Sequence, residues 1–331
     1  MLRQRRTEEQ GAFTVLVAIS LLCLLGLTGL VIDGGRAYAA RRGAQNAADA
    51  AALAGTGALN DVLFDSTGQE AVVHEAVVAS VAANDVNGIP ECRLVDEAQS
   101  DLGPCPESNT GAGLPSTVAG VSVRARDNQD GSFIKALGID GFSASAVATA
   151  QIQALRQGSS PFLICGLDSS QQGFDPPLLL QSGSTWTINP AAINQTYELH
   201  APQVPDCGAG SESFKGLGDG SAVVPVPGWW EGETGVHAGP IRNIVARADG
   251  CTSTDGFNTS AGCTLIVPIC VDGNGTGTAV EFYCVRFGIF RVSQSNANSH
   301  EAVFLGAGIV RSGQGGGRPV ANEARVIKLS R

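Results

Sequence analysis

The chain has 331 residues and a formal net charge of −10, with 21 basic against 31 acidic side chains. This balance argues against nucleic acid or an anionic membrane surface as the main partner, since both reward basic patches. The length allows one membrane segment plus one or two compact domains. The 43 glycines and an aromatic content of 5% favour a loop-rich β architecture with a thin core.

The first predicted element is a membrane-spanning helix, Ala12–Ile32, which carries no charge and follows a cytoplasmic tail of residues 1–11. At ~1.5 Å per residue this helix would be ~31 Å long, close to the ~30 Å thickness of the hydrocarbon core. The alternative is a cleaved signal peptide, because Ala37-Tyr38-Ala39 has the small-x-small form of a cleavage site. The apolar run exceeds the usual ~7–15 residues of a signal core, which favours a retained anchor.

Arginines do not decide the orientation of this helix, because three precede it and three follow it closely. They are Arg3, Arg5, Arg6, Arg36, Arg41 and Arg42. Eight cysteines beyond the span favour an oxidising compartment, since no CxxC pair or zinc-ligand spacing occurs. They are Cys92, Cys105, Cys165, Cys207, Cys251, Cys263, Cys270 and Cys284. The N-terminus is therefore expected in the cytoplasm and the chain from Asp33 onward outside it. Eight buried, reduced cysteines in a cytoplasmic protein are the alternative.

Residues 33–59 are expected to continue the membrane helix as an alanine-rich stalk, because alanine has the highest helix propensity. Small residues on its surface bury little area but allow another element to approach closely. The stalk would pack against a partner, against the protein's own domain or against a second copy. A tether that touches nothing is the alternative.

Residues 60–156 are predicted to form a membrane-proximal α+β region. A helix over residues 68–84 would be capped by Asp65-Ser66-Thr67, with His74 at the edge of the core. A loop over residues 87–116 would be clipped by a local bridge between its two cysteines. A strand over residues 117–125, a turn at "DNQDG", a short helix over 133–137 and a strand over 143–152 would follow.

Residues 157–331 are predicted to form a cysteine-containing, mainly β ectodomain. The expected strands are 161–165, 178–181, 185–188, 264–270, 279–290, 302–309 and a final "ARVIKLS". Asp272-Gly273-Asn274-Gly275 has the residues of a hairpin turn. If this turn centres on Gly273-Asn274, Cys263 falls opposite Cys284, whereas a wider loop would pair other residues. The connectivity of the eight cysteines stays open.

Two loops carry polar residues that could support chemistry. Asp168 and Ser170 begin a D-x-S-x-S metal pattern, but Gln172 replaces its second serine, which favours a polar turn. The "DGNGTG" run has Tyr283 where a calcium loop needs a bidentate glutamate, so an EF-hand is excluded.

A third loop, "PGWWEGETGVHAG", sets Trp229 and Trp230 beside Glu231, Glu233 and His237. Exposed aromatic side chains mark interfaces, so the two tryptophans are candidates for a partner or sugar contact. A carboxylate pair for glycoside hydrolysis is the weaker alternative, since such pairs usually come from separate strands. No nucleophile elbow, phosphate loop or dinucleotide fingerprint occurs, and we expect no catalytic residue, cofactor or metal.

The N-terminal segment "EQGAFTVLVAISLLCLLGLTGLVIDGGRAYAARRGAQNAADAAALAG" resembles TadG-like proteins of the tight-adherence (Flp) pilus assembly system. The residues that carry the resemblance beyond the apolar run are Asp33, Arg36, Tyr38, Gln45, Ala47, Ala48 and Asp49. TadE-type pseudopilins and Flp pilins have a glutamate five residues after the glycine of their peptidase site. Leu16 stands there in this chain, counted from Gly11, so the resemblance favours an anchored accessory protein over a processed pilin.

The resemblance implies a non-enzymatic envelope protein of the bacterial cytoplasmic membrane whose partners are other pilus-assembly envelope proteins. The expected fold is α+β, with one transmembrane helix, the stalk, a small α+β unit and a disulfide-bridged β-rich region. Two alternatives remain: a surface adhesin or glycan-binding module on the same anchor, and a minor pseudopilin processed at Gly11-Ala12.

Overall fold

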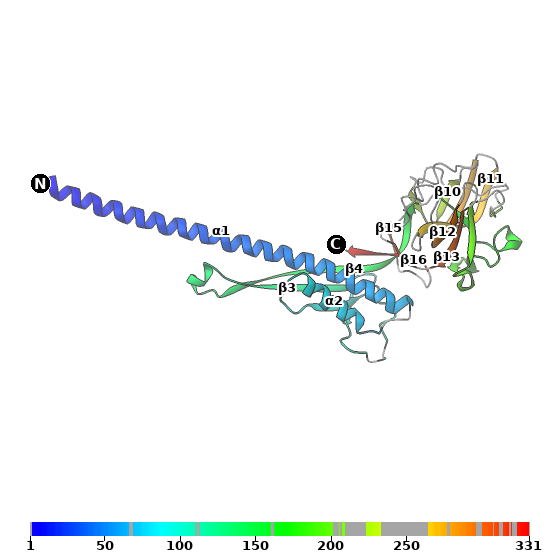
Figure 1. Cartoon of the computed structure of the whole chain (residues 1–331), viewed down its shortest axis with the longest axis horizontal. Helices are drawn as coiled ribbons and strands as arrows, with labels where there is room; N and C mark the ends of the chain where they lie inside the picture. The colour runs from blue at the N-terminus through cyan, green and yellow to red at the C-terminus, as the bar shows by residue number, and fades with distance from the viewer. Residues whose placement is uncertain are drawn as a thin grey trace. The chain divides into compact units, whose positions relative to one another are not determined.

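The computed structural model describes residues 2–65, 69–109, 111, 113–159, 162–200, 205, 207–208, 223–232, 264–276, 279–295, 300–306, 308–310, 314–317, 319 and 323–330. The chain divides into two compact units (Figure 1). The first unit holds residues 1–62, 67–150 and 329–331, and the second holds residues 63–66 and 151–328.

One long helix dominates the first unit. Helix α1 runs without a break from Leu2 to Asn60 and ends in a π-helical turn, Asp61–Asp65 (Figure 1). The membrane segment and the stalk are therefore halves of the same helix. No proline interrupts the sequence over these residues, and the alanines of the second half favour helix strongly.

Four strands of an eight-stranded sheet and a second helix complete this unit. Strands β1 (Glu91–Val95), β2 (Asp101–Pro104), β3 (Gly120–Asp130) and the first part of β4 (Gly141–Ser159) follow the order β4-β3-β1-β2. Helix α2, Val72–Ala83, precedes them, and a 3₁₀ helix, η2 (Ile134–Leu137), joins β3 to β4.

Three local predictions for this region are wrong. Strands β1 and β2 occupy the stretch expected to be a loop, because their backbone groups pair with β3 and with each other. Strand β3 continues through the "DNQD" expected in a turn, so the chain reverses over residues 131–140 instead. Helix α2 begins after Ala71, without a side-chain cap, and Asp65 ends the π-helical turn.

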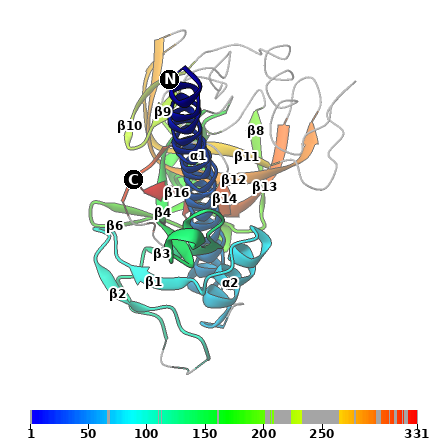
Figure 2. The ribbon, with the colours of Figure 1, turned by 90° about the vertical axis from the view of Figure 1, so that its left-hand side faces the viewer.

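The core of the first unit lies where α1, α2 and β3 meet. Val73, Val77 and Val81 of α2 recur at helical spacing and are buried. Strand β3 alternates buried and exposed residues, and its Val121, Val123 and Ala125 are fully buried. Figures 1 and 2 both show α2 and β3 beside the second half of α1, which supplies the third wall of this core.

The second unit is mainly β. One sheet has the order β5-β11-β12-β13-β8, with β10 paired to β12. Its strands are β5 (Ile164–Cys165), β8 (Thr196–His200), β10 (Gly228–Gly232), β11 (Thr264–Thr276), β12 (Ala279–Ser295) and β13 (His300–Gly306). Its core is mostly aliphatic, and five phenylalanines are among its largest fully buried side chains: Phe162, Phe282, Phe287, Phe290 and Phe304.

Shorter strands complete this unit. The second part of β4 pairs with β9 (Val223–Pro225) and β15 (Gln314–Gly315), and β14 (Gly308–Val310) lies parallel to β16 (Ala324–Ser330). Strands β6 (Leu179–Ser182) and β7 (Thr185–Ile188) form a separate hairpin. Two 3₁₀ helices, η3 (Ser169–Gln171) and η4 (Pro190–Ala192), lie in the connections. The α+β class with a mostly β C-terminal region is confirmed.

The β11–β12 hairpin has a different register from the one considered above. Gly273 pairs with Phe282 and Thr276 with Ala279, so the strands run through the expected turn and close beyond it. Irregular pairing around Cys270 shifts the register, and Cys270 lies opposite Cys284. A turn centred on Gly273-Asn274 is therefore wrong, because the pairing of the two strands outweighs the local turn preference of these residues.

Candidate membrane anchor and the hairpin that contacts it

The first half of α1 presents a continuous apolar surface. Phe13 is 68% exposed and Val31 is 74% exposed, and the large apolar residues between them are exposed as well. By length and composition α1 is the one helix in the described part of the chain that could cross a membrane. Thirteen exposed large apolar side chains between Phe13 and Ile32 are unfavourable in water and favourable in lipid.

Asp33 marks the end of this apolar surface and is itself buried. Its Oδ1 accepts the backbone N–H of Ser132 at 3.1 Å, and its Oδ2 accepts those of Phe133 and Ile134 at 2.9 and 2.7 Å. The first N–H groups of a helix lack intrahelical partners, so a carboxylate from α1 caps η2. A charged acceptor makes these hydrogen bonds stronger than neutral ones.

Arg36 adds a second contact from α1 to the same hairpin. Its Nη1 donates to the hydroxyl oxygen of Ser132, directly before η2. Asp33 and Arg36 are three residues apart and therefore lie on the same face of the helix. Two of the residues that carry the family resemblance thus hold the β3–β4 connection against α1.

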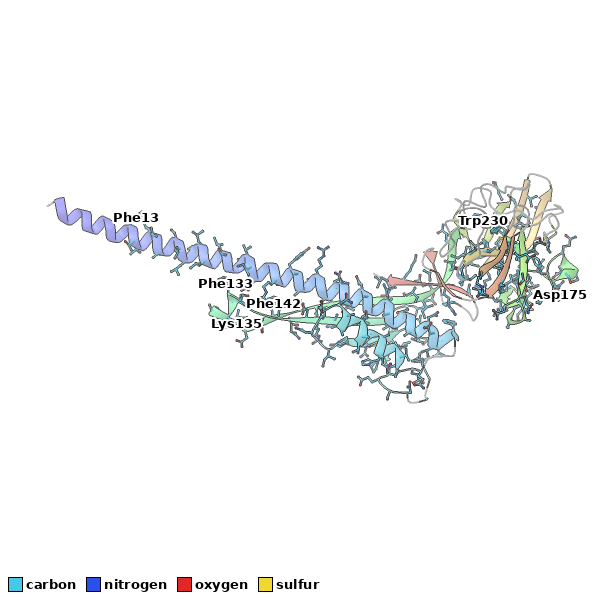
Figure 3. All side chains as sticks on the ribbon, in the orientation of Figure 1. Phe13, Phe133, Lys135, Phe142, Asp175 and Trp230 are labelled. Carbon is cyan, nitrogen blue, oxygen red and sulfur yellow. A yellow bond between two sulfur atoms is a disulfide. The ribbon has the colours of Figure 1, made fainter. Side chains whose placement is uncertain are left out.

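Gly29 allows this connection to approach the helix closely. A Cβ atom on Gly29 would lie 2.7 Å from the Cβ atom of Phe133, which is too short for ordinary packing. Figure 3 shows Phe133 and Lys135 at the end of the hairpin beside α1. The sequence predicted the short helix after Phe133 but not its partner on α1, because about a hundred residues separate them.

The second half of α1 buries its alanines. Ala44, Ala47, Ala48, Ala51 and Ala52 are fully buried, and Ala40 nearly so. At Gly55 a Cβ atom would meet side chains of Val77 and Val121 at 2.6 and 3.3 Å. The Thr56 hydroxyl donates to the carbonyl oxygen of Ala150 at 3.1 Å. The stalk therefore packs against its own domain, and its alanine-rich face is already covered.

The other polar residues of the resemblance lie at the surface of α1. The Tyr38 side chain is 70% exposed. The Gln45 amide donates to Asp49 Oδ1 at 2.8 Å, an i,i+4 pair on the exposed side. Tyr38, Gln45 and Asp49 thus present polar groups to solvent on the stretch of α1 that follows the apolar segment, while Ala47 and Ala48 face the core.

Three disulfides join six of the cysteines in the described residues. They are Cys92–Cys105, Cys165–Cys207 and Cys270–Cys284. The first joins the two cysteines expected to clip the loop after α2. Cys23 is a free thiol on the exposed apolar half of α1. Cys251 and Cys263 lie outside the described residues.

The two tryptophans of the candidate contact loop have different surroundings. Trp229 is 49% exposed, and its ring lies 5.4 Å from that of Tyr283 at a tilted angle. Trp230 packs against the core, and its Nε1 donates to the carbonyl oxygen of Pro225 at 3.1 Å. Glu231 is exposed, whereas Glu233 and His237 lie outside the described residues. Trp229 is thus the surface residue of the pair.

The two polar loops are built as local structure. Asp168 caps η3, accepting the backbone N–H groups of Ser170 and Gln171 at 2.9 and 3.2 Å. Asp272 lies in β11 opposite Tyr283 rather than in a turn. In the part of the chain that the structure describes, no group of three or more His, Cys, Asp or Glu residues is placed to hold a metal ion.

Comparison with protein families gave a match that covers most of α1. Residues 11–61 match the family described as "Putative Flp pilus-assembly TadE/G-like". This segment is TadE/G-like. Comparison with the curated proteins and with the solved structures gave no match. The TadE/G-like segment begins just before the apolar surface and ends at Asp61, so it includes Gly29, Asp33, Arg36 and the buried alanines.

The match confirms the resemblance to the TadE/TadG-like family and points to a role in Flp pilus assembly. This family is a pilus-assembly family and is not known as an enzymatic one. Together with the apolar half of α1, the match suggests a membrane-anchored envelope protein.

Proposed function

We propose that this chain is a non-enzymatic, single-pass envelope protein of the tight-adherence (Flp) pilus assembly system, acting through contacts with other pilus-assembly envelope proteins. The observation that carries the proposal is the division of the TadE/G-like segment into two halves. The first half of α1 exposes apolar side chains, which suits lipid, and the second half buries its alanine-rich face in a folded domain. A segment of this kind attaches a domain to a bilayer.

The proposed orientation places the N-terminus in the cytoplasm and the chain from Asp33 onward outside it. The arginines that flank the apolar half of α1 do not decide the matter, since three lie on each side. Disulfides persist in oxidising compartments. Three disulfides distributed over both units support an extracytoplasmic location for everything after α1.

A topology experiment tests the anchor and its orientation. The full-length chain carries alkaline phosphatase at its C-terminus, an enzyme that is active only where disulfides form. We expect phosphatase activity, recovery of the chain in the membrane fraction and protection of its ectodomain thiols from alkylation until reduction. Recovery of the full-length chain as a soluble species with free thiols would refute the proposal.

The intact mass of the extracted protein separates the remaining possibilities at the N-terminus. An uncut chain supports the anchor. Loss of the first 11 residues would identify a processed minor pseudopilin, since cleavage would then follow Gly11. Cleavage after Ala39 would identify a secreted protein and remove the apolar half of α1.

The role in pilus assembly is tested in the source cells. We expect deletion of the gene to abolish assembled pili, and the full-length chain to restore them. A variant in which a soluble secretion signal replaces residues 1–32 should fail to restore pili although its ectodomain is exported. Normal pili in the deletion strain would contradict the proposal.

A second candidate function is glycan or surface binding, and it rests on Trp229. This half-exposed indole lies beside Tyr283 on a β-strand surface, and such paired aromatic rings can stack on a sugar. Trp229→Ala should abolish adhesion with pili intact if this candidate is correct. Leu180→Ala, at a 45% exposed apolar residue elsewhere in the same unit, is the matched control.

A further inference from the structure

The hairpin tip, residues 131–140 between β3 and β4, exposes apolar side chains beside the apolar half of α1. Ile139 is 51% exposed, and Phe133 is 44% exposed even though it packs against Gly29. The tip has a defined fold: Gly131 donates its N–H to the carbonyl oxygen of Asp140 at 2.9 Å, and Ile139 donates to that of Ile134 at 3.2 Å. Exposed apolar side chains on a folded tip beside the apolar surface of α1 mark a candidate site of contact with lipid or protein.

The contacts of the tip fix its position along α1. Asp33 follows the apolar run directly and holds the start of η2, while Gly29 lies four residues inside that run. At ~1.5 Å per residue, Phe133 meets the helix ~6 Å inside the end of the apolar run. This is the depth at which interfacial apolar side chains reside, ~5–10 Å into the boundary between headgroups and acyl chains.

We propose that the hairpin tip inserts into the interface of the same bilayer that α1 spans, in the leaflet on the side of Asp33. The inference rests on the proposed function, in which α1 is a membrane anchor. Continuity with the lipid-facing surface of α1 selects lipid as the occupant: residues 29–32 of α1 and the tip lie at the same level along the helix, so a bilayer that covers one covers the other.

The charges around the tip agree with this depth. Lys135 is exposed at the end of the tip, as Figure 3 shows, and its long side chain can lay its methylenes along lipid while its ammonium reaches the phosphates. Asp130 and Asp140 are exposed at the base of the tip, at the ends of the two strands. The two carboxylates thus lie where the tip joins β3 and β4, and the apolar side chains of the tip lie beyond them. The tip can therefore enter the interface while these carboxylates stay in water.

A second lipid contact would orient the first unit on the membrane. A single helix is free to tilt and rotate until packing or interfacial anchors fix it. The tip contacts α1 through Asp33, Arg36 and Gly29, so its insertion would fix one side of the helix toward the sheet. The sheet would then leave the bilayer surface in one defined direction.

Depth-dependent fluorescence quenching tests the proposal on the full-length protein. The protein is reconstituted in vesicles of phosphatidylethanolamine and phosphatidylglycerol that contain nitroxide-labelled lipid, labelled either near the headgroup or deep in the acyl chain. One sample carries an environment-sensitive fluorophore on Ile139→Cys in a Cys23→Ser background. A second carries it on Ser145→Cys in the same background, and a third on the native Cys23. Ser145 is exposed on β4, ~13 Å along the strand from its start at Gly141.

We expect the emission of the position 139 label to lie to the blue of that of the Ser145 label. We also expect the headgroup-labelled lipid to quench the position 139 label more than the acyl-labelled lipid does. The Cys23 label should be quenched more by the acyl-labelled lipid, because Cys23 lies near the middle of the apolar run. The Ser145 label should show little of either effect.

The three labels separate the two ways of failing. Quenching at Cys23 without quenching at position 139 would overturn the insertion of the tip and leave the anchor standing. Absence of quenching at Cys23 would overturn the anchor and, with it, the inference. A position 139 label that is shielded from aqueous iodide but not quenched by lipid would mean that the tip contacts protein, which also overturns the proposal.

Discussion

At the scale of single residues, Asp33 carries the contact between α1 and the hairpin tip. Its carboxylate is buried and accepts three backbone N–H groups of Ser132, Phe133 and Ile134. A buried charge is costly unless it is hydrogen-bonded. The three donors meet this requirement, and in return the carboxylate satisfies N–H groups that η2 leaves free.

Replacing Asp33 by alanine should release the hairpin tip. The three N–H groups would lose a charged acceptor, at a local cost of about 1–3 kcal/mol. Hydrogen exchange at the amides of Phe133 and Ile134 should accelerate accordingly. Asp49→Ala is the control, because the Asp49 carboxylate bonds only the exposed Gln45 amide among the hydrogen bonds described above, and should leave this exchange unchanged. Equal protection in both variants would contradict the assigned role of Asp33.

Tyr197 reports on the core of the second unit through its pKa. The side chain is buried between the rings of Phe174 and Phe304, and its hydroxyl donates to the carbonyl oxygen of Pro176 at 3.0 Å. Burial disfavours the phenolate and raises the pKa of Tyr197 from 10.0 to about 12. Because the folded-state pKa is raised, the protonated form stabilises the fold below pH 10.

The free energy of unfolding should therefore fall by roughly 2–3 kcal/mol as the pH rises from about 10 to about 12. Tyrosinate absorbance in the near ultraviolet checks this, since the chain has three tyrosines. We expect one of them to titrate late, and Tyr197→Phe to remove that late step. If all three tyrosines of the folded protein ionise together near pH 10, the burial argument fails.

At the scale of elements, α1 changes its surroundings along its length while its backbone stays regular. Its first half exposes leucine, valine and phenylalanine, and its second half buries alanine and glycine. Large side chains suit lipid, which has no fixed shape to match. Small side chains suit a sheet and a helix that approach closely, because interdigitated packing leaves no room for more atoms.

Two glycines of the second half provide a matched test of this packing. Gly55→Ala places a Cβ atom 2.6 Å from Val77 Cγ2, whereas a Cβ atom on Gly57 meets nothing within 4 Å. Overpacking costs about 1–3 kcal/mol, while an exposed Gly→Ala change in a helix gains up to about 1 kcal/mol. Thermal unfolding in detergent should therefore show a lower midpoint for Gly55→Ala and an equal or higher one for Gly57→Ala. Equal midpoints for the two variants would show that α1 and α2 pack less closely than described.

At the scale of the whole molecule, each of the two units has its own core and its own disulfides. Cys92–Cys105 belongs to the first unit, and Cys165–Cys207 and Cys270–Cys284 belong to the second. Each disulfide stabilises mainly by restricting the unfolded chain of its own unit. These disulfides add stability to units with few large aromatic side chains to bury, since aromatic residues make up 5% of the sequence.

Removing the disulfide of the first unit should leave the second unit intact. Cys92→Ser together with Cys105→Ser opens a loop with a sequence separation of 13, at a cost of about 3 kcal/mol. Limited proteolysis followed by mass spectrometry should show faster cleavage within residues 69–130 and unchanged cleavage within residues 264–295. Equal acceleration in both regions would mean that the units unfold together.

Much of the first unit could be predicted from local patterns. An uncharged apolar run of bilayer length, an alanine-rich continuation and a valine pattern at helical spacing are each properties of contiguous residues. The disulfides were expected as a class but not as pairs, because connectivity depends on how distant segments meet. The two strands after α2 were missed, because their pairing with β3 outweighs a composition typical of loops.

The sequence alone determined that a charge-free apolar run the length of a bilayer leads into an alanine-rich segment, and that the two together resemble a pilus-assembly family. That information lies in neighbouring residues, and helix formation depends on them. Only the tertiary structure decided that Asp33 and Gly29 contact a hairpin tip about a hundred residues away and that the alanines face β3 and α2. It also decided that Trp230 packs against the core while Trp229 is exposed. The physical reason is that hydrogen bonding and close packing act between groups that are adjacent in space, wherever they stand in the chain.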